Sequence, residues 1–316
     1  MKNILVKGAG VGGLVMANTL VQNNINVTVS APDDAPIGSA SWFAGGMLAP
    51  YCEREGAEQI VQDLGLKAMK WWAQTLPKLI VHRGTLVVAP TRDNHELERF
   101  SKRTQGHRII DEKEIALLEP DLAGRFNKGL FYETEAHIDV RKALTSLKSL
   151  LISKEVPFVG TDILEEKYDF IIDATGIARL QDDAHLRGVR GEMLLVKTKD
   201  VSLSRPVRLL HPRIPLYIVP RENNVFMIGA TMIESDFNGA ISARSMMEFL
   251  NAAYTLHPAF AEAEIIEAGV AVRPSYPDNF PRVQKLDKLI TINGFYRHGF
   301  LLAPEMANQA MKFIKE

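Results

Sequence analysis

A glycine-rich turn near the start of the chain constrains the fold more than any other feature. The apolar run at residues 4–6 leads into "KGAGVGG", which places Gly8, Gly10 and Gly13 in a G-x-G-x-x-G spacing. The apolar residues that follow recur at helical spacing, and residues 27–29 form a second apolar run. A strand, a glycine turn, a helix and a second strand in this order are typical of a parallel nucleotide-binding sheet.

Each glycine of this turn has a physical reason to be glycine. Gly8 permits the tight turn, Gly10 lets the backbone approach a pyrophosphate, and Gly13 allows the helix to pack closely on the strand. The phosphate charge would then meet the N-terminus of the helix. The alternative is a merely tight strand-to-helix turn, which the flanking strand and helix make less attractive than nucleotide binding.

The second strand ends on a residue that is unusual for such a fold. Ser30 stands where an acid normally binds the ribose, and a hydroxyl cannot accept two charge-assisted hydrogen bonds as a carboxylate does. A cofactor with a 2′-phosphate would need a nearby arginine, and the next basic residue is Arg54. We therefore expect the Ser30 hydroxyl to bind the ribose, with or without Asp33 or Asp34, which equally fit the description of solvated loop acids.

The rest of the chain alternates between helical and extended patterns without a linker or a repeat. Helical patterns occur near residues 57–75 and 140–153, and β-rich stretches at 84–89, 192–197, 216–219 and 225–230. The run at 168–176 suits a central strand of the first sheet, and 289–294 suits another return to it. A parallel nucleotide-binding sheet and a more antiparallel second sheet, in interleaved domains, explain this order.

Composition excludes several classes of function. The 37 basic and 38 acidic residues leave a net charge of −1, so a nucleic acid or anionic membrane partner is not expected. The single cysteine, Cys52, rules out an intramolecular disulfide, and no spaced set of metal ligands is present. No run approaches the roughly 18 apolar residues that span a bilayer, and we expect a cytoplasmic protein.

Several further segments together resemble one known family. "GSASWFAGGMLAP" at 38–50, "YIVPRENNVFMIGATM" at 217–232, "AGVAVRPSYPDNFP" at 268–281 and "GFYRHGFLLAPEMA" at 294–307 are similar to segments of the D-amino-acid oxidase superfamily, in its glycine oxidase branch of the thiamin pathway, as are 83–89 and 189–196. The resemblance covers most of the chain. Three departures from the family are the serine at position 30, His298 in place of an asparagine, and a shorter chain.

The resemblance implies a fold and a cofactor. We expect an α/β protein with a Rossmann-like FAD-binding domain at 1–80, 136–186 and 266–316, and an interleaved α+β substrate domain at 81–135 and 187–265 whose mostly antiparallel sheet caps the flavin. FAD would be bound non-covalently, because Cys52 lies far from the late cysteine that attaches flavin in relatives of sarcosine oxidase type. Cys52 itself is interpreted as a small packing residue rather than a catalytic one. The family also implies a homo-oligomer.

The resemblance, together with the glycine turn, predicts the residues that bind FAD. The start of the last helix would face the flavin pyrimidine oxygen, where the partial positive charge of the helix favours the reduced flavin. No catalytic role is assigned to His298. The predicted cofactor-binding residues are Gly8, Gly10, Gly13, Ser30, Ser39, Ala40, Ser41, Gly45, Gly46, Met47, Leu48, Thr175, Gly176, His298, Gly299, Phe300, Leu301 and Leu302.

Four residues are predicted to act on the substrate. Arg273 sits where the family's carboxylate-binding arginine does, and its fork can hold a carboxylate still; the alternative is a strand-end arginine paired with a core acid. Tyr217 would add a polar contact, and Met232 would limit side-chain size; without the resemblance both would be assigned to the core. Arg297 would add charge near the flavin, or else form a structural ion pair.

The expected reaction is oxidative deamination. A hydride would pass from the substrate Cα to flavin N5, water would hydrolyse the imino acid, and dioxygen would accept the electrons to give hydrogen peroxide. The sequence leaves open whether glycine, sarcosine or a small D-amino acid is preferred, because one methyl group changes affinity by only about 1–3 kcal/mol. Two rivals also stay open: a dehydrogenase that passes electrons to a quinone or protein, and a non-catalytic flavin-binding protein.

Overall fold

The glycine turn connects the first strand and helix as predicted. The computed structural model describes residues 2–211 and 216–315, and in it β1 (Asn3–Lys7) and β2 (Asn26–Ser30) are parallel neighbours on either side of α1 (Val11–Gln22) in the chain. The register pairs Val6 with Val29, and both side chains are fully buried. The β–α–β unit that the sequence predicts is therefore confirmed.

Four later strands complete a six-stranded sheet around this unit. They are β9 (Phe158–Val159), β10 (Phe170–Asp173), β17 (Arg282–Leu286) and β18 (Leu289–Asn293), and the order across the sheet is β17-β18-β10-β1-β2-β9. All neighbours are parallel except β17 with β18. The central position of β10 and the return of β18 to this sheet agree with the sequence prediction.

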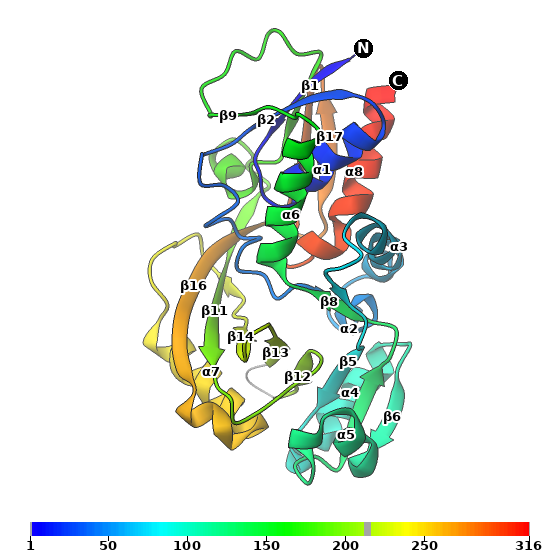
Figure 1. Cartoon of the computed structure of the whole chain (residues 1–316), viewed down its shortest axis with the longest axis vertical. Coiled ribbons are helices and arrows are strands. Elements are labelled where there is room, and N and C mark those ends of the chain that lie inside the picture. The colour runs from blue at the N-terminus through cyan, green and yellow to red at the C-terminus, as the bar shows by residue number, and fades with distance from the viewer. Residues whose placement is uncertain (1, 212–215, 316) are drawn as a thin grey trace.

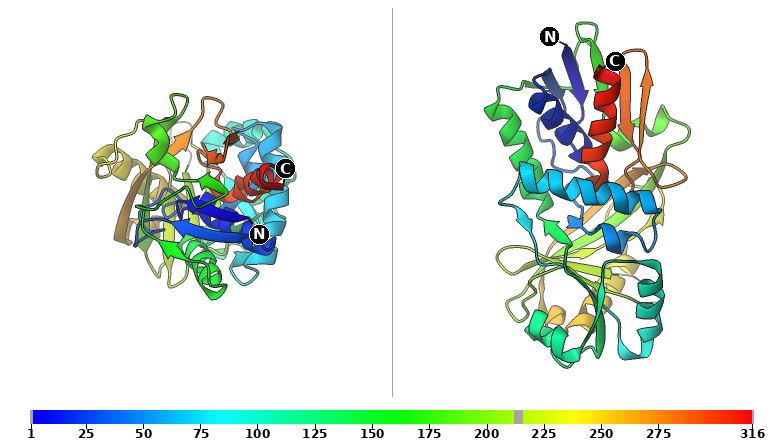
Figure 2. Two further views of the ribbon diagram at one scale, coloured as in Figure 1. Left: turned by 90° about the horizontal axis from the view of Figure 1, so that it is seen from above. Right: turned by 90° about the vertical axis from the view of Figure 1, so that its right-hand side faces the viewer.

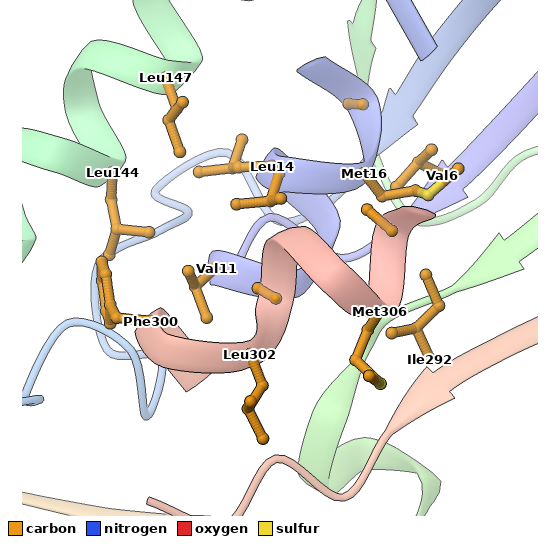
Figure 3. Close-up of a cluster of buried hydrophobic side chains, with 14 of the residues drawn as sticks. Val6, Val11, Leu14, Met16, Leu144, Leu147, Ile292, Phe300, Leu302 and Met306 are labelled. Carbon is orange, nitrogen blue, oxygen red and sulfur yellow. The ribbon is translucent and has the colours of Figure 1, made fainter. Parts of the chain in front are cut away.

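One face of this sheet carries the largest hydrophobic core. The helices α1, α3 (Gln59–Thr75), α6 (Val140–Ser153) and α8 (Gly299–Lys315) supply it together with the strands. Figure 3 shows side chains of α1, α6 and α8 in this cluster, among them Leu14, Leu144 and Leu302, with Met306 of α8 beside Ile292 of β18. The opposite face is covered more thinly, by Tyr168 and its neighbours from the segment before β10.

A second, nine-stranded sheet lies below the first in Figure 1. Its strands are β5 (Thr85–Val88), β6 (Arg108–Asp111), β7 (Lys128–Tyr132), β11 (Arg187–Lys197), β12 (Val207–Leu209), β13 (Leu216–Pro220), β14 (Val225–Gly229), β15 (Ile233–Glu234) and β16 (Glu264–Ser275). Every strand pair is antiparallel except β12 with β5. The expectation of a mostly antiparallel second sheet is confirmed.

The two faces of the second sheet have different roles because successive side chains of a strand point to opposite sides. On one face, Ile218 and Leu194 join a core with α5 (Glu112–Leu118) and α7 (Ala243–Leu256). Tyr217 alternates with Ile218 in β13, so its side chain lies on the other face. That face is the one from which a functional site is built.

The remaining elements connect the two sheets. A small sheet is made of β3 (Met47–Leu48), β8 (Ala136–Ile138) and β4 (Ile80–Val81), and the further helices are α2 (Pro50–Glu53) and α4 (Asn94–Arg103), with 3₁₀ turns at Thr91–Asp93, Pro120–Leu122, Gly176–Gln181 and Pro258–Glu262. Both chain ends lie at the same end of the elongated molecule (Figure 2). Among the described helices, none is long and apolar enough to cross a membrane. The predicted domain ranges stay a prediction.

Candidate active site

One large cavity receives residues from both sheets. Its volume is about 930 Å³, and its walls combine the turn before α1, the segment at 38–47, the cavity face of the second sheet and the start of α8. Segments that are far apart in the sequence therefore meet at one concave surface, which is the usual form of a cofactor and substrate site.

The turn at α1 leaves no room for side chains where the fold is tightest. Gly8 has φ of +99°, and a Cβ there would lie 2.5 Å from the carbonyl oxygen of Ala174. At Gly13 a Cβ would lie 1.9 Å from the Gly8 oxygen, whereas at Gly10 the nearest atom is the Ser41 hydroxyl oxygen at 3.4 Å. Gly8 and Gly13 are thus needed for packing, and Gly10 stands at the open end, facing the cavity.

The N-terminus of α1 points its free backbone donors into this cavity. The first intrahelical hydrogen bond runs from the Leu14 N–H to the Gly10 carbonyl, and the Val11 N–H donates to Ser41 Oγ at 3.0 Å. The N–H groups of Gly12 and Gly13 precede that first bond, so they have no partner within the helix. Such a helix start fits a pyrophosphate.

The predicted ribose end of the cavity has an unusual set of polar groups. The Ser30 hydroxyl donates to the Gly160 carbonyl oxygen at 2.9 Å, and Lys7 in the adjacent strand pairs with Glu165 at 2.7 Å. Ser30, Lys7 and Asp34 line the cavity. The hydroxyl oxygen of Ser30 keeps lone pairs with which it can accept a hydrogen bond from a ribose, while its proton fixes the loop at Gly160.

A carboxylate that the sequence interpretation missed shapes the nearby wall. Asp173, at the end of β10, accepts hydrogen bonds from the backbone N–H and the hydroxyl of Thr175, at 3.1 and 2.6 Å. The Asp173 side chain is buried, at 5% exposure, so its partners are protein groups. Arg179 Nη1 lies 3.5 Å from its second oxygen. The apolar run before a Thr-Gly turn indicated the strand, but nothing in the sequence marked the acid as the group that holds the turn.

The start of α8 brings a second helix N-terminus to the cavity. The Leu302 N–H donates to the His298 carbonyl at 2.8 Å, so the N–H groups of residues 299–301, and not that of Leu302, lack an intrahelical partner. The His298 side chain is 3% exposed, and burial lowers its pKa to about 4. Its ring is therefore neutral near pH 7, and the positive end of the helix dipole is the main local charge from this element.

Most of the predicted cofactor-binding residues lie in the cavity wall. Those that line it are Gly8, Gly10, Ser30, Ser39, Ala40, Ser41, Gly45, Gly46, Met47, Thr175, Gly176, His298, Gly299, Phe300 and Leu301. Leu48 and Leu302 are fully buried in the core, and Gly13 packs against Gly8. Two helix N-termini with free N–H groups, together with a glycine-lined wall, fit the pyrophosphate and the flavin ring of a flavin dinucleotide.

Arg273 stands out among the arginines of the cavity. Its guanidinium passes over Gly191, where a Cβ would lie 2.3 Å from it, and its Nη1 donates to the Thr231 carbonyl at 2.9 Å. Burial lowers its pKa from the ordinary value of 12.5. No carboxylate forms an ion pair with it among residues 2–211 and 216–315, so the alternative of a strand-end arginine paired with a core acid does not describe it.

The Tyr217 ring is held between two glycines. A Cβ at Gly45 would lie 2.7 Å from the ring, and one at Gly229 would lie 3.0 Å from the hydroxyl oxygen. Burial raises the pKa of Tyr217, although the charge of Arg273 acts in the opposite direction. The hydroxyl therefore keeps its proton and can donate a hydrogen bond beside Arg273.

Met232 and Arg297 meet at the outer part of the cavity. Arg297 Nη1 lies 3.3 Å from the Met232 sulfur, and the Tyr296 hydroxyl donates to the same sulfur at 3.1 Å. Arg297 Nε also lies 2.9 Å from Glu53, so the structure places it in an ion pair. Met232 is 45% exposed, and its thioether lies at the solvent side of the cavity.

Two further charged residues of the cavity were not predicted. Arg208 of β12 lies directly across from Tyr217 in β13, and its Nη1 donates to Glu53 at 3.2 Å. Glu53 is 8% exposed; burial would raise its pKa, but Arg297 and Arg208 lower it to about 2. The strand alternation that places Tyr217 on the cavity face would have found Arg208, whereas Glu53 lies in a charged segment that gave no pattern.

The one cysteine takes no part in the cavity wall. Cys52 is 1% exposed, and its backbone N–H donates to Glu135 at 2.8 Å. Burial raises the pKa of its thiol well above the ordinary value. These facts agree with the interpretation of Cys52 as a packing residue.

The chain matches a family model and curated relatives over nearly its whole length. The model of the family of FAD-dependent oxidoreductases termed DAO matches residues 3–311. The chain is 54% identical over 313 residues to the "Putative thiamine biosynthesis oxidoreductase ThiO" of Rhizobium etli, covering 98% of this chain and 95% of that protein. It is 28% identical to the glycine oxidase of Bacillus subtilis, covering 95% of this chain and 89% of that protein.

Solved structures share the fold. The glycine oxidase from Geobacillus kaustophilus superposes with a TM-score of 0.82 at 21% identity, covering 99% of this chain and 94% of that one. The iminodiacetate oxidase from Chelativorans sp. BNC1 superposes with a TM-score of 0.84 at 20% identity, covering 99% and 95%. The chain that builds this cavity belongs to the DAO family of FAD-dependent oxidoreductases, as its resemblance to the D-amino-acid oxidase superfamily predicts.

Proposed function

We propose that this protein catalyses the oxidative deamination of glycine or another small amine or D-amino acid with dioxygen as the oxidant. For glycine the balanced reaction consumes one O₂ and one water and yields glyoxylate, ammonia and hydrogen peroxide. FAD, when bound, supplies the chemistry of accepting two electrons and a proton as a hydride from the substrate Cα. The protein's own residues then have to bind, orient and desolvate the substrate.

The observation that carries the proposal is the state of Arg273. It is the arginine of this part of the cavity whose guanidinium has no carboxylate partner within the described chain, and it lies beside the protonated Tyr217 hydroxyl. A guanidinium fork and a hydroxyl donor together match a carboxylate, and a partly buried site strengthens both hydrogen bonds. A substrate held at its carboxylate presents its Cα in a fixed direction, which supplies much of the rate by orientation.

Other residues around this point restrict what can bind. Tyr217 is itself fixed between Gly45 and Gly229, so the carboxylate position is rigid. Met232 and Arg297 close the outer side of the cavity and leave less room for a substrate side chain. No protein base is required if the amine enters in its neutral form, and His298, whose pKa is lowered to about 4, would not supply positive charge near pH 7.

The relatives support a role in the supply of a thiamin precursor. The protein with the highest identity among those named above carries the name "Putative thiamine biosynthesis oxidoreductase ThiO". The chain is also 26% identical to a "Bifunctional protein ThiO/ThiG" of Synechocystis, of which it covers 50%. We infer that the product of this oxidation serves the synthesis of the thiamin thiazole. The homo-oligomer and the cytoplasmic location expected from the sequence stay predictions.

The experiment that tests the proposal measures all products at once. FAD-loaded protein is incubated with glycine, sarcosine and D-alanine in air, and oxygen uptake, peroxide and the oxo acid are quantified. We expect equal amounts of oxygen consumed and peroxide formed, with matching glyoxylate from glycine. Turnover with an artificial electron acceptor but without peroxide would instead establish the dehydrogenase, and absence of turnover with every substrate and acceptor would leave a flavin-binding protein.

A further inference from the structure

The proposed substrate position is surrounded by more positive charge than one carboxylate requires. Arg208, Arg273 and Arg297 all line the cavity, and each acts electrostatically on the buried ring of His298. Among the acids that line the cavity, Glu53 is the one that pairs with Arg208 and Arg297 in the described part of the chain. Three positive charges and one negative charge leave a net charge of 3 − 1 = +2 in this group, because His298 is neutral.

Glu53 divides its two oxygens between two of the three arginines. Its Oε1 accepts a hydrogen bond from Arg208 Nη1 at 3.2 Å, and its Oε2 lies 2.9 Å from Arg297 Nε and 3.4 Å from His298 Nδ1. These partners come from β12 and from the turn before α8, whereas Glu53 ends the short helix α2. The carboxylate is thus fixed by groups from separate parts of the chain.

No other carboxylate of the described residues forms an ion pair with Arg208 or Arg297. Glu135 also lies in this region, and it is fully buried with its carboxylate accepting the Cys52 N–H. It forms no ion pair with Arg208 or Arg297 among the described residues, and burial raises its pKa to about 7. The pairing of Arg208 and Arg297 with a carboxylate therefore depends on Glu53.

We propose that Glu53 determines substrate charge specificity: by occupying Arg208 and Arg297 it leaves Arg273 as the arginine that binds a carboxylate, and so restricts the site to substrates with a single carboxylate. This inference rests on the proposed function for the role of Arg273. It follows that the cavity contains a second anion-binding position, blocked by the protein's own carboxylate. Removing that charge would make dicarboxylates acceptable ligands.

A purely structural role of Glu53 makes a different prediction. If the carboxylate served only to join α2, β12 and the turn before α8, its loss would weaken folding and the binding of every ligand alike. If it blocks a second anion position, its loss raises affinity for dicarboxylates. A gain of this kind cannot result from partial unfolding, so the two roles are separable.

The test compares two ligands that differ by one carboxylate. Acetate and malonate are titrated calorimetrically into the FAD-loaded wild type and the Glu53→Gln variant, at a pH where both malonate carboxyls are ionised. We expect the wild type to prefer acetate, and the variant to bind malonate at least about tenfold more tightly than the wild type does, as a new charge-assisted hydrogen bond allows. The same change is expected in turnover of iminodiacetate relative to sarcosine, which also differ by one carboxylate.

Two further variants locate the effect. In Glu53→Gln/Arg208→Gln the gain for malonate should fall sharply, because one of the released arginines is gone. Glu119→Gln is the matched control: Glu119 is 1% exposed and pairs with Arg205 at 2.7 Å, and neither residue lines the cavity. This control loses a buried carboxylate of the same kind, and its ratio of malonate to acetate affinity should equal that of the wild type.

The binding measurement separates this inference from the proposed function. A protein that binds acetate and switches to malonate on Glu53→Gln, yet oxidises no amine, would retain the inference and lose the activity. Unchanged or weaker malonate binding in a folded Glu53→Gln variant would overturn the inference, as would a wild type that already prefers malonate or binds neither ligand. If Glu53→Gln does not fold, Glu53→Asp serves instead, because the shorter carboxylate cannot reach both arginines and should give a partial gain in malonate affinity. A folded Glu53→Asp variant without that gain would also overturn the inference.

Discussion

Arg273 differs from the other cavity arginines in its partners rather than in its position. Arg208 and Arg297 share Glu53, whereas Arg273 contacts the Thr231 carbonyl and has no acid within the described residues. Burial of the Arg273 guanidinium without an acidic partner disfavours its charged form, and this lowers its pKa. A guanidinium kept in this state is ready to bind an anion, and we therefore assign the substrate carboxylate to Arg273.

The first prediction concerns Arg273→Leu and Arg273→Lys. Both should raise the KM for glycine, by roughly 100-fold for leucine, because a bidentate charge-assisted contact is lost, and lysine should restore part of the loss because it keeps the charge without the fork. Steady-state kinetics with KM and kcat determined separately checks this. Arg141→Gln, which breaks a surface pair with Glu267 outside the cavity, is the control, and wild-type kinetics in Arg273→Leu would refute the assignment.

Of the departures from the family, Ser30 is the one that we expect to affect FAD binding most. Its hydroxyl proton is used in the bond to Gly160, so any contact to the ribose must use the oxygen lone pairs. We predict that Ser30→Ala weakens FAD binding about five- to tenfold, in line with the loss of one or two neutral hydrogen bonds. Equilibrium titration of apoprotein with FAD measures this. Unchanged affinity, with a lowered melting temperature of the apoprotein, would show that Ser30 only fixes the loop.

The site residues differ in how far the sequence could reveal them. Arg273 and Tyr217 were predicted through family resemblance, because they occur in segments with recognisable order. Glu53 and Arg208 are 155 positions apart, and the fold alone brings them within 3.2 Å. An ion pair between distant segments leaves no local pattern, which is why the cluster that controls the charge of the cavity was missed.

At the scale of the elements, two helix N-termini converge on one cavity. α1 and α8 pack against each other, with Gly12 placed so that a Cβ would lie 2.8 Å from Phe295 and one at Gly299 would lie 3.0 Å from Val11. Small residues at these starts let the two helix N-termini lie close together. Two partial positive charges then face one dinucleotide, at neighbouring points of the cavity.

The prediction for these elements contrasts two glycines of the same turn. Gly13→Ala should lower the free energy of unfolding of the apoprotein by roughly 2 to 4 kcal/mol, because its Cβ would overlap the Gly8 carbonyl. Gly10→Ala should leave that free energy nearly unchanged, since its Cβ would make only an ordinary contact with the Ser41 hydroxyl at 3.4 Å. It should instead weaken FAD binding by obstructing the pyrophosphate. Urea unfolding and FAD titration separate the two. Equal stability losses in both variants would contradict the distinction.

Secondary structure was predictable where apolar residues recur regularly. The patterns near 57–75 and 140–153 correspond to α3 and α6, and the predicted stretches at 84–89, 192–197, 216–219 and 225–230 correspond to β5, part of β11, β13 and β14. The strands β9, β12 and β17 were not predicted. The stretch from 91 to 135 gave no such pattern. Its helix α4 is highly charged and buries only Leu97 and Phe100, so too little of its apolar face is present in the sequence to indicate it.

At the scale of the whole molecule, buried titratable groups link stability to pH. His137 and His298 are 4% and 3% exposed, and burial lowers their pKa values from 6.5 to about 3 and about 4. Below pH 6.5 the unfolded chain binds protons that the native state excludes, so the free energy of unfolding falls as the pH drops from 6.5 towards 4. Glu135, whose pKa burial raises from 4.5 to about 7, acts oppositely: its contribution falls as the pH rises from 4.5 to 7.

The corresponding prediction is that Glu135→Gln steepens the pH dependence. Without the opposing carboxyl, the free energy of unfolding of the apoprotein should rise between pH 5 and pH 7 by about 1 to 3 kcal/mol more than in the wild type. Urea unfolding at both pH values measures the difference. A slope equal to or smaller than that of the wild type would mean that Glu135 is ionised in the native state across this range.

The interleaved course of the chain ties the two sheets into one site. The strand β16 enters from the second sheet and carries Arg273, and the chain then continues through β17 and β18 to the start of α8, so cofactor and substrate residues follow each other directly. The sequence indicated this order, because the segments at 268–281 and 294–307 resemble consecutive segments of the family. The relation of the two sheets across the cavity depends on the packing of many side chains and could not be predicted from local patterns.

The central claim is that Arg273 and the FAD-binding cavity together oxidise a small amino acid. The most direct test is the visible spectrum of the FAD-loaded protein before and after anaerobic addition of glycine, in the wild type and in Arg273→Leu. We expect rapid loss of the oxidised-flavin band in the wild type and a much slower loss in the variant. A bound flavin that stays oxidised in the wild type with glycine, sarcosine and D-alanine would contradict it.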